Sequence, residues 1–448
     1  DVDGGAGNYL WAADFSDQNK AMVLDLNLGG TQSFAGGSET SVERLSFKTG
    51  SGDDVIKTLT GAAGAGLADS VSTGAGSDLI RVGGGLDAVD GGAGVDTLVI
   101  DYSDATDPIR SGGGFFTDDH SRTLNFSNIE KFNVSTGSIG DNFATGNGED
   151  TVSAGGGDDH FDTLKGQATV DGGAGVDTWG ADFSNLGAAV VLDLSTPGAQ
   201  VFAGGKVTGV EAVDFTLGGL ADTVTTLIGT EDTGGRVDCN NDTIRGGGGD
   251  DVITVGGGTD QVDGGDGFDR LIVDYSGSGF AVRTGSSFVT NDHGMTVTYA
   301  NIEDVDLILT HGADKAQAGA GADMLDGGAG RDVLWGGAGH DTFRFSALGD
   351  SAVGTEDRIR DFADGADRID LSSIDAGSGM AGDQAFAFIG TDAFHHVAGE
   401  LRYERVGHHT LVSGDVDGDG QADFAIKLDG LHALTAASFV LCTWRSPL

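Results

Sequence analysis

Cysteine, proline and positive charge are all scarce in this sequence. Its two cysteines, Cys239 and Cys442, are too few for a disulfide framework, and neither has neighbouring ligands for a metal site. Lys and Arg number 24 against 70 Asp and Glu, which gives a net charge of −46. Nucleic acids and anionic membranes require basic patches that such a chain lacks, and no apolar run approaches the roughly 20 residues of a membrane-spanning helix. We therefore expect no nucleic-acid partner and no membrane insertion.

Two common catalytic motifs are missing as well. The sequence has no H-E-x-x-H of a zinc protease and no G-x-S-x-G of a nucleophile elbow. Two histidine pairs, His395 with His396 and His408 with His409, have no supporting cysteine or helical spacing, which favours surface histidines over a transition-metal site. We predict no catalytic residue in this chain.

Glycine and aspartate are abundant instead, and they recur together. Glycine makes up 81 of the 448 residues, far above the usual share of about 7 %, and without the three-residue period of collagen. Aspartates return every nine residues, as in Asp78, Asp87 and Asp96, within frames that approximate G-G-x-G-x-D-x-U-x, where U is a large apolar residue. The clearest frames are GGAGRDVLW and GGAGHDTFR at 327–344.

This frame supplies the ligands that calcium prefers. Glycine reaches backbone angles barred to residues with a Cβ, so G-G-x-G can turn sharply with its carbonyls directed at one point, and aspartate adds charge. Calcium takes six to eight oxygens, a number that two stacked turns can provide. We predict multiple calcium ions, with ligands Asp54, Asp78, Asp87, Asp96, Asp150, Asp159, Asp177, Asp242, Asp251, Asp260, Asp269, Asp323, Gly328, Gly330, Asp332, Gly337, Gly339 and Asp341.

The period also predicts local structure. The residues after each aspartate should form a short strand with U in the core, as for Leu334. If one nine-mer makes half a coil, Asp78 and Asp96 lie on one edge and Asp87 on the other, with calcium between turns n and n+2. A solvated Gly-Asp linker is the alternative, but a linker has no reason to keep a strict period with an apolar residue at one phase.

The nonapeptide resembles the RTX, or hemolysin-type, calcium-binding repeat. The resemblance implies an all-β fold, a parallel β-roll or β-helix solenoid of calcium-binding nonapeptides. It also implies a secreted, extracellular or cell-surface protein whose folding depends on calcium.

A longer repeat encloses the nonapeptides. Four copies, such as VDGGAGVDTLVIDYS, start near residues 2, 89, 170 and 262. In each copy the aspartate of D-[FY]-S precedes a glutamate by 29 residues. These pairs are Asp14 with Glu43, Asp101 with Glu130, Asp182 with Glu211, and Asp274 with Glu303. Fixed length indicates packing in register, so we expect wider β-rungs of the same solenoid. Paired carboxylates can run acid-base chemistry, but four equivalent copies favour a structural bracket.

The last hundred residues resemble the C-terminal module of serralysin-type secreted metalloproteases, on DTFRFSALGDS, DRIRDFADGADRIDLSSIDA and GELRYERVGHHTLVSGDVDGDGQADFAIKLDG. The resemblance implies a cap on the roll and an uncleaved signal for a type I secretion apparatus. We thus predict a β-roll of long repeats and nonapeptide rungs over 1–344 and a C-terminal β capping and secretion module over 345–448. The extension CTWRSPL after the hydrophobic LTAASFVL departs from the family pattern.

Within this module, Asp415, Asp417 and Asp419 with Gly420 match D-x-D-x-D-G. An EF-hand needs glutamate at loop position 12, where this sequence has Ile426, so an EF-hand is excluded. A calcium-binding turn on the three aspartates and an Asp-Gly hairpin turn both remain open.

Residue 1 is Asp and the chain opens inside a long repeat, so we expect the C-terminal portion of a longer protein or a processed chain. Three functions fit: a structural or adhesive extracellular protein of surface-layer, matrix or adhesin type, the β-roll of a secreted protease or lipase, or a polysaccharide-modifying solenoid. Candidate partners of the folded chain are a second copy of itself and cell-surface polysaccharide.

Overall fold

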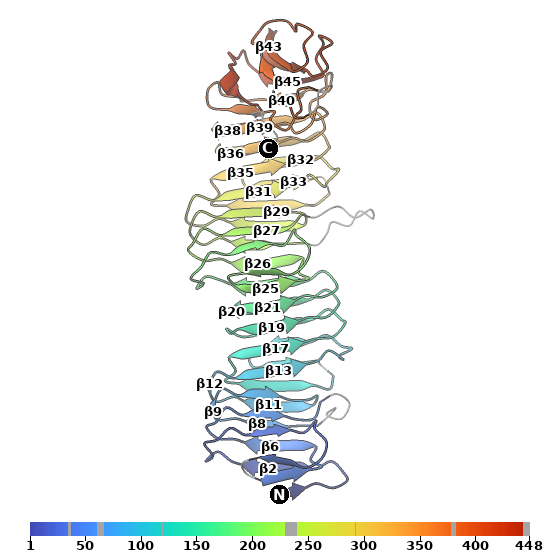
Figure 1. Cartoon of the computed structure of the whole chain (residues 1–448), viewed down its shortest axis with the longest axis vertical. Coiled ribbons are helices and arrows are strands. Elements are labelled where there is room, and N and C mark those ends of the chain that lie inside the picture. Colours follow the sequence, from blue (N-terminus) through green and yellow to red (C-terminus); the bar gives the residue numbers. More distant parts are fainter. Residues whose placement is uncertain are drawn as a thin grey trace. The chain divides into compact units, whose positions relative to one another are not determined.

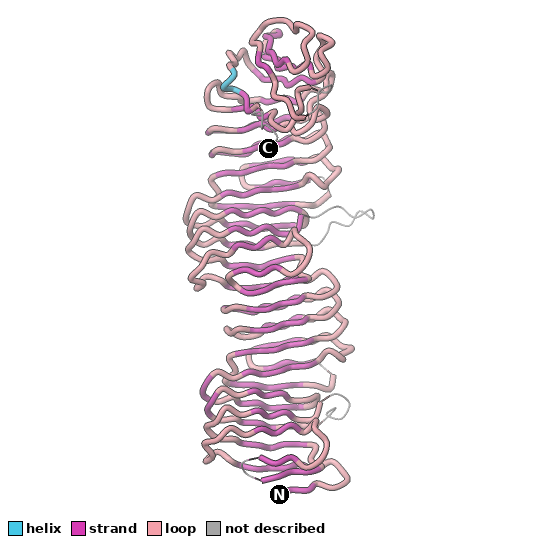
Figure 2. Tube along the Cα trace, viewed as in Figure 1, coloured by secondary structure: helices cyan, strands magenta, loops and turns pink. Residues whose placement is uncertain are grey.

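A computed structural model describes residues 1–34, 37–60, 67–118, 120–228, 240–291, 293–377 and 382–441. Strands dominate these residues, and the helical content shown in Figure 2 is a single 3-10 turn, η1 (Ala436–Ser438). No helix in the described ranges is both long and apolar enough to cross a membrane. The structure confirms the predicted all-β fold with long parallel sheets. Cys239 and Cys442 lie outside the described residues.

The chain divides into two compact units, Asp1–Thr216 (unit 1) and Leu217–Leu448 (unit 2). Each unit contains parallel strands stacked one above the other, which are labelled in Figure 1. The domain boundary predicted at residue 344 falls inside unit 2 and stays a prediction.

In unit 1 the strands form two series. One sheet runs in the order β24-β25-β21-β19-β17-β13-β10-β7-β3. Its strands are β3 (Val23–Asp25), β7 (Val55–Lys57), β10 (Leu79–Arg81), β13 (Thr97–Asp101), β17 (Lys131–Ser135), β19 (Asp150–Ser153), β21 (Ala168–Asp171), β24 (Gln200–Phe202) and β25 (Gly205–Thr208). The other series contains β2 (Leu10–Asp14), β6 (Arg44–Lys48), β8 (Ser70–Ser72), β11 (Leu86–Asp90), β14 (Arg110–Gly112), β15 (Phe115–Thr117), β16 (Thr123–Ser127), β18 (Asn142–Ala144), β20 (His160–Lys165), β22 (Thr178–Asp182) and β26 (Ala212–Thr216).

Unit 2 repeats this arrangement. One parallel series contains β27 (Thr223–Ile228), β29 (Val252–Gly256), β31 (Arg270–Asp274), β35 (Asp304–Ile308), β37 (Met324–Asp326), β39 (Thr342–Arg344), β41 (Arg368–Asp370) and β46 (Phe439–Val440). The second series is parallel except for β33, and it contains β28 (Thr243–Arg245), β30 (Thr259–Asp263), β32 (Val282–Gly285), β33 (Phe288–Asn291), β34 (Thr296–Ala300), β36 (Lys315–Gly321), β38 (Val333–Gly339) and β40 (Asp357–Ile359). An antiparallel set, β43 (Glu400–Val406), β44 (His409–Asp415) and β45 (Phe424–Asp429), joins it through the parallel pair β40 and β45.

Two nonapeptides make one coil. Leu79 of β10 pairs with Thr97 of β13, and Met324 of β37 pairs with Thr342 of β39, a register of 18 residues in both units. The residue two places after each ladder aspartate points inward because successive strand side chains alternate between faces. Leu334 is fully buried in this way. The apolar phase of the nonapeptide therefore builds the core.

The long repeats form wider rungs, and they contain antiparallel strands that the sequence did not predict. Their coils are longer than 18 residues, since Leu86 of β11 pairs with Thr123 of β16, and part of the surplus folds back as antiparallel strands. β15 pairs antiparallel with both β14 and β16, and β33 does the same between β32 and β34. The added strand gives the longer coil backbone hydrogen bonds that a loop would lack.

Candidate metal centres

The predicted ligand aspartates form ladders that run from coil to coil. The backbone N–H of Asp54 donates to Oδ1 of Asp78 (2.7 Å), and that of Asp78 donates to Oδ1 of Asp96 (2.9 Å). Asp87 lies in a separate ladder, where its Oδ1 accepts from the N–H of Asp69 (2.9 Å). Consecutive bonds of this kind also join Asp141, Asp159 and Asp177, Asp222, Asp251 and Asp269, Asp242 and Asp260, Asp314 and Asp332, and Asp323 and Asp341. Alternate nonapeptides thus place their aspartates in different ladders, as the half-coil prediction requires.

The second oxygen of most ladder aspartates is buried and has no hydrogen-bond partner among the described residues. A buried carboxylate oxygen without a partner is costly, so each of these positions needs a cation or a proton. The side chains concerned are at most 3 % exposed. They belong to Asp54, Asp78, Asp87, Asp96, Asp141, Asp159, Asp177, Asp251, Asp260, Asp269, Asp323, Asp332, Asp341 and Asp357. Asp150 differs, because its Oδ1 accepts from the N–H of Phe132 and its Oδ2 from the hydroxyl of Thr145.

Backbone carbonyls converge on the same points. A Cβ built on Gly246, the first residue of its nonapeptide, would lie 2.4 Å from Oδ2 of Asp251 and 2.3 Å from the carbonyl oxygen of Gly264 in the next coil. On Gly336 it would lie 2.2 Å from Oδ2 of Asp341. The glycine leaves room for an all-oxygen donor set, which is the set that Ca²⁺ selects. The residues of the ladders therefore fit calcium.

The predicted glycine ligands fall into two conformational classes. Gly328, Gly337 and Gly339 have φ values of 68°, 106° and 147°, in the region that glycine alone adopts readily. Gly330 is not among the positive-φ residues, but a Cβ there would lie 1.9 Å from the carbonyl oxygen of Gly312. Both classes bring coils too close together for a side chain.

Burial and neighbouring carboxylates perturb the ladder electrostatically. Desolvation, with the charges of adjacent ladder carboxylates adding to it, raises the pKa of Asp87, Asp159, Asp251 and Asp323 to about 7. A nearby divalent cation would reverse this balance by favouring the ionised form. The cation-free ladder thus binds protons at a pH where an exposed aspartate binds none.

Comparison with known families agrees with this geometry. The RTX calcium-binding nonapeptide repeat (4 copies) matches residues 64–98, 135–170 and 145–178, and the Peptidase M10 serralysin C terminal matches residues 239–441. The chain carries RTX nonapeptide repeats and a serralysin-type C-terminal region. RTX nonapeptides bind calcium at multiple sites, and RTX and serralysin-type proteins are exported through type I secretion. This RTX chain is therefore a secreted, extracellular calcium-binding protein.

Curated relatives match a short part of the RTX chain. Metallopeptidase AprA of Pseudomonas marginalis is 36% identical over 93 residues, which cover 21% of this chain and 18% of the relative. Metalloprotease AprA of Pseudomonas entomophila (strain L48) is 38% identical over 96 residues, which cover 21% and 19%. The matched region thus spans less than a fifth of either relative's length.

Two solved structures also align with the RTX chain. The AlgE6R3 subunit of the Azotobacter vinelandii mannuronan C5-epimerase is 26% identical, with 47% of this chain and 82% of that chain covered and a TM-score of 0.20. Extracellular lipase LipA from Serratia marcescens is 15% identical, with 51% and 40% covered and a TM-score of 0.19.

The RTX ladders also include residues outside the predicted ligand set. Asp69 joins the ladder of Asp87, Asp357 accepts from the N–H of Asp332 (2.8 Å), and Asp367 accepts from that of Asp341 (3.0 Å). Intervals of 25 and 26 residues hide Asp357 and Asp367. Asp69 keeps the period, nine residues before Asp78, but lacks the glycine frame. The triplet D-x-U would have found them, because each aspartate is followed two residues later by Val or Ile.

The three aspartates of D-x-D-x-D-G lie together in the loop between β44 and β45. One carboxylate oxygen from each of Asp415, Asp417 and Asp419 lies within 4.8 Å of the others. Asp415 is buried and accepts the N–H groups of Gly418 and Gly420, whereas Asp417 and Asp419 are exposed and accept N–H groups of their own loop. The loop is a hairpin turn, and calcium binding at it stays a prediction.

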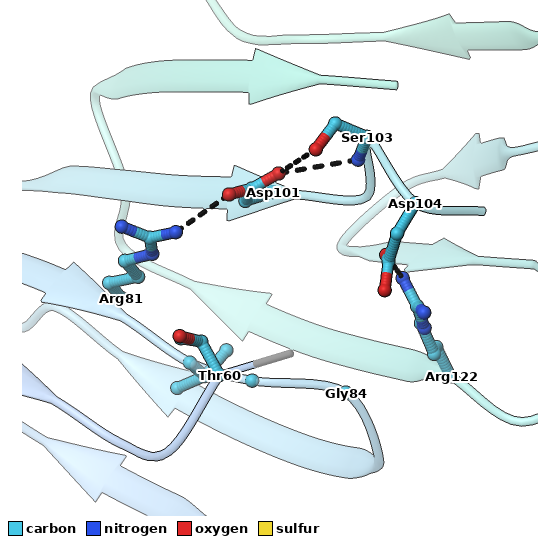
Figure 3. A pocket seen from close by; sticks show the side chains of 9 residues that line it. Thr60, Arg81, Gly84, Asp101, Ser103, Asp104 and Arg122 are labelled. Atoms are coloured by element: carbon cyan, nitrogen blue, oxygen red, sulfur yellow. Dashed lines mark hydrogen bonds and ion pairs between the residues drawn. The ribbon is translucent and has the colours of Figure 1, made fainter. Parts of the chain in front are cut away.

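The D-[FY]-S aspartates hold local structure. Asp101 caps the N–H of Ser103 and forms an ion pair with Arg81 (2.6 Å), beside a second pair of Arg122 with Asp104 (2.7 Å). Both pairs, drawn in Figure 3, line one cavity of about 240 Å³. Equivalent caps on Ser16, Ser184 and Ser276 are made by Asp14, Asp182 and Asp274.

The Arg81–Arg122 pocket joins an arginine of the preceding rung to the second long repeat, and an aromatic ring lies against Arg122. Sequence reasoning did not find this cluster. The guanidinium carbon of Arg122 lies over the ring of Tyr102, 5.3 Å from the centre of that ring. Burial, with the nearby Asp87 charge adding to it, raises the pKa of Tyr102 well above its usual range. The tyrosine is buried, and both arginines are paired with carboxylates.

Proposed function

We propose that this chain is a structural or adhesive segment of an extracellular protein, of surface-layer, matrix or adhesin type. The observation that carries the proposal is the identical use of the repeated carboxylates. Each long repeat places one oxygen of its glutamate on a backbone N–H 34 residues earlier, at 2.8 to 2.9 Å in every copy. Groups that repeat the same backbone bond four times support coil stacking rather than chemistry at one centre.

Because the chain needs calcium to fold, we expect it to fold outside the cell and not inside it. In a cell interior poor in calcium, a net charge of −46 opposes compaction of the chain. Extracellular calcium modules bind at about 10⁻⁴ to 10⁻³ M, close to the concentration outside cells. At tenfold excess over the dissociation constant, each site adds about 1.4 kcal/mol to folding. Many weak sites together would fold the chain after export.

Self-association and surface attachment test the proposal. The calcium-loaded chain is studied by sedimentation velocity over a wide concentration range, and by co-sedimentation with envelopes of the cells that secrete it. We expect larger species or retention in the envelope pellet in millimolar calcium, and loss of both in chelator. A chain that is monomeric at every concentration and stays in the supernatant would overturn the adhesive role.

A secreted enzyme that carries this chain as its β-roll is a second candidate, because AprA metallopeptidases are 36% and 38% identical to part of this chain. The deciding measurement is the sequence of the full gene. An H-E-x-x-H motif there would replace the structural proposal with a protease.

A further inference from the structure

Each long repeat contains a left-handed residue at one fixed position. Ser41, Asn128 and Asn301 have φ values of 54°, 52° and 51°, and Gly209 has 58°. Each stands two residues before the glutamate of its copy. Five non-glycine residues in the described ranges have positive φ, and three of them occupy this position. Left-handed backbone is unfavourable for residues with a Cβ, so its recurrence here indicates a functional constraint.

The left-handed residue directs its carbonyl oxygen to the place that a glycine carbonyl occupies in a regular rung. A Cβ on Gly91 would lie 2.1 Å from the carbonyl oxygen of Asn128 and 2.7 Å from Oδ2 of Asp96. On Gly264 the distances to the carbonyl oxygen of Asn301 and to Oδ2 of Asp269 would be 2.1 and 2.6 Å. In the third copy, a Cβ on Gly172 would lie 1.8 Å from the carbonyl oxygen of Gly209 and 2.8 Å from Oδ2 of Asp177. A regular rung shows the same pair of oxygens beside Gly246.

The glutamate takes the place of the ladder aspartate. Oε2 of Glu130 accepts the N–H of Asp96 (2.9 Å), as Oδ1 of Asp96 accepts that of Asp78. A nonapeptide has five residues from its first glycine to its aspartate, whereas the long repeat has two from Asn128 to Glu130. The additional methylene of glutamate makes its side chain longer than that of aspartate, which compensates for the shorter turn.

Three of the four copies have a buried carboxylate oxygen that faces the turn. Asp96, Asp177 and Asp269 are fully buried, and their Oδ2 atoms have no partner among the described residues. In the first copy the equivalent position is Tyr9, although Glu43 still accepts its N–H (2.8 Å) and Gly4 still faces the carbonyl oxygen of Ser41. The first copy therefore lacks one carboxylate of the oxygen set.

We propose that the triplets ending in Glu130, Glu211 and Glu303 are compact calcium half-sites, each replacing a whole nonapeptide. Each one completes a calcium site with the aspartate of the coil before it, and the triplet ending in Glu43 does not. The inference deepens the calcium-dependent folding proposed above and rests on it. It assigns three calcium sites to glutamates outside the nonapeptide frame.

Calcium stoichiometry of the full chain tests this assignment. Bound calcium is counted by titration against a chromophoric chelator, with circular dichroism to establish folding at saturating calcium. Glu130→Gln, Glu211→Gln and Glu303→Gln keep an oxygen for the backbone N–H and should each lose one ion, and the triple variant three. Glu43→Gln is the matched control and should lose none.

A gain-of-site variant keeps the test independent of folding defects. Tyr9 is 45% exposed, so Tyr9→Asp should be tolerated and should add one calcium ion. The double variant Tyr9→Asp with Glu43→Gln should add none. If the unaltered chain folds with calcium but every variant keeps its ion count, only the glutamate assignment fails. If the unaltered chain binds no calcium, the proposed calcium-dependent folding fails as well.

Discussion

In excess chelator, lowering the pH from about 8 to about 5.5 should restore β-structure that the calcium-free chain lacks at pH 8. The reason is the raised pKa of the ladder aspartates, of which Asp159 and Asp251 reach about 7. A group whose folded pKa is raised gives stability that is complete below its unfolded pKa of about 3.8 and is lost as the pH rises through about 7. Each pH unit between those values is worth about 1.4 kcal/mol per group. Protons thus substitute for calcium.

Carboxylates in ion pairs lose their stabilising effect in acid, so they set the lowest pH at which the calcium-free chain should fold. Although burial opposes the shift, hydrogen bonds from Arg358 and the charges of Arg358 and Arg360 lower the pKa of Asp429. Its stabilising contribution is present above the unfolded pKa and is lost as the pH falls through the lowered value. At about pH 5.5 the protonated ladders and the ionised pairs therefore act together.

Asp323→Asn separates ladder protonation from general charge reduction. An amide imitates the protonated acid, so this variant should be more stable than the unaltered chain in chelator at pH 8, and should bind less calcium. Asp17→Asn removes the same charge at an exposed site and should change neither quantity by more than about 0.5 kcal/mol. Equal effects of the two variants, or no gain of β-signal in acid, would contradict the electrostatic account.

Gly339→Ala should abolish calcium-induced folding of the coils around it or raise the calcium midpoint severalfold. Its φ is 147°, and an added Cβ would lie 1.5 Å from the carbonyl oxygen of Gly321 in the preceding coil. Strand separation would have to increase where β36 and β38 pair Gly321 with Gly339. We expect a cost on the order of 3 kcal/mol in unfolding free energy at saturating calcium, measured by denaturant titration.

Gly319→Ala is the matched control for this prediction. Gly319 lies in the same strand pair, has no positive φ, and a Cβ on it meets nothing within 4 Å. The control variant should therefore unfold at the same denaturant concentration and calcium midpoint as the unaltered chain. A Gly339→Ala variant that behaves like the control would show that the close approach of the coils is not needed for folding.

The sequence is most informative where a period is strict. The spacing of Asp78, Asp87 and Asp96 predicts two ladders, and the pairing of Leu79 with Thr97 shows the 18-residue coil that this requires. The period works because every coil must place the same groups over the same neighbours. Where an insertion lengthens a coil, the interval between ladder aspartates changes while their hydrogen bond persists. The nine-residue period therefore does not predict Asp357.

Other features depend on contacts between coils that no local pattern encodes. Arg81 ends β10 and Arg122 immediately precedes β16, 41 residues later, yet both line the same pocket. The roles of the long-repeat glutamates could not be predicted without the backbone geometry, since the amino-acid type of Asn128 does not reveal its left-handed conformation. Alternating apolar and polar residues indicate a strand but not its direction, so the sequence does not predict that β15 runs antiparallel to its neighbours.

Calcium titration of the full chain by far-ultraviolet circular dichroism tests the central claim most directly. The account predicts an unfolded spectrum in excess chelator at pH 8, and a cooperative gain of β-signal as free calcium rises to millimolar concentrations. Magnesium at the same concentration should give little of this signal, because it prefers a smaller octahedral site that retains water. An equally strong β-spectrum in chelator and in millimolar calcium would contradict the account.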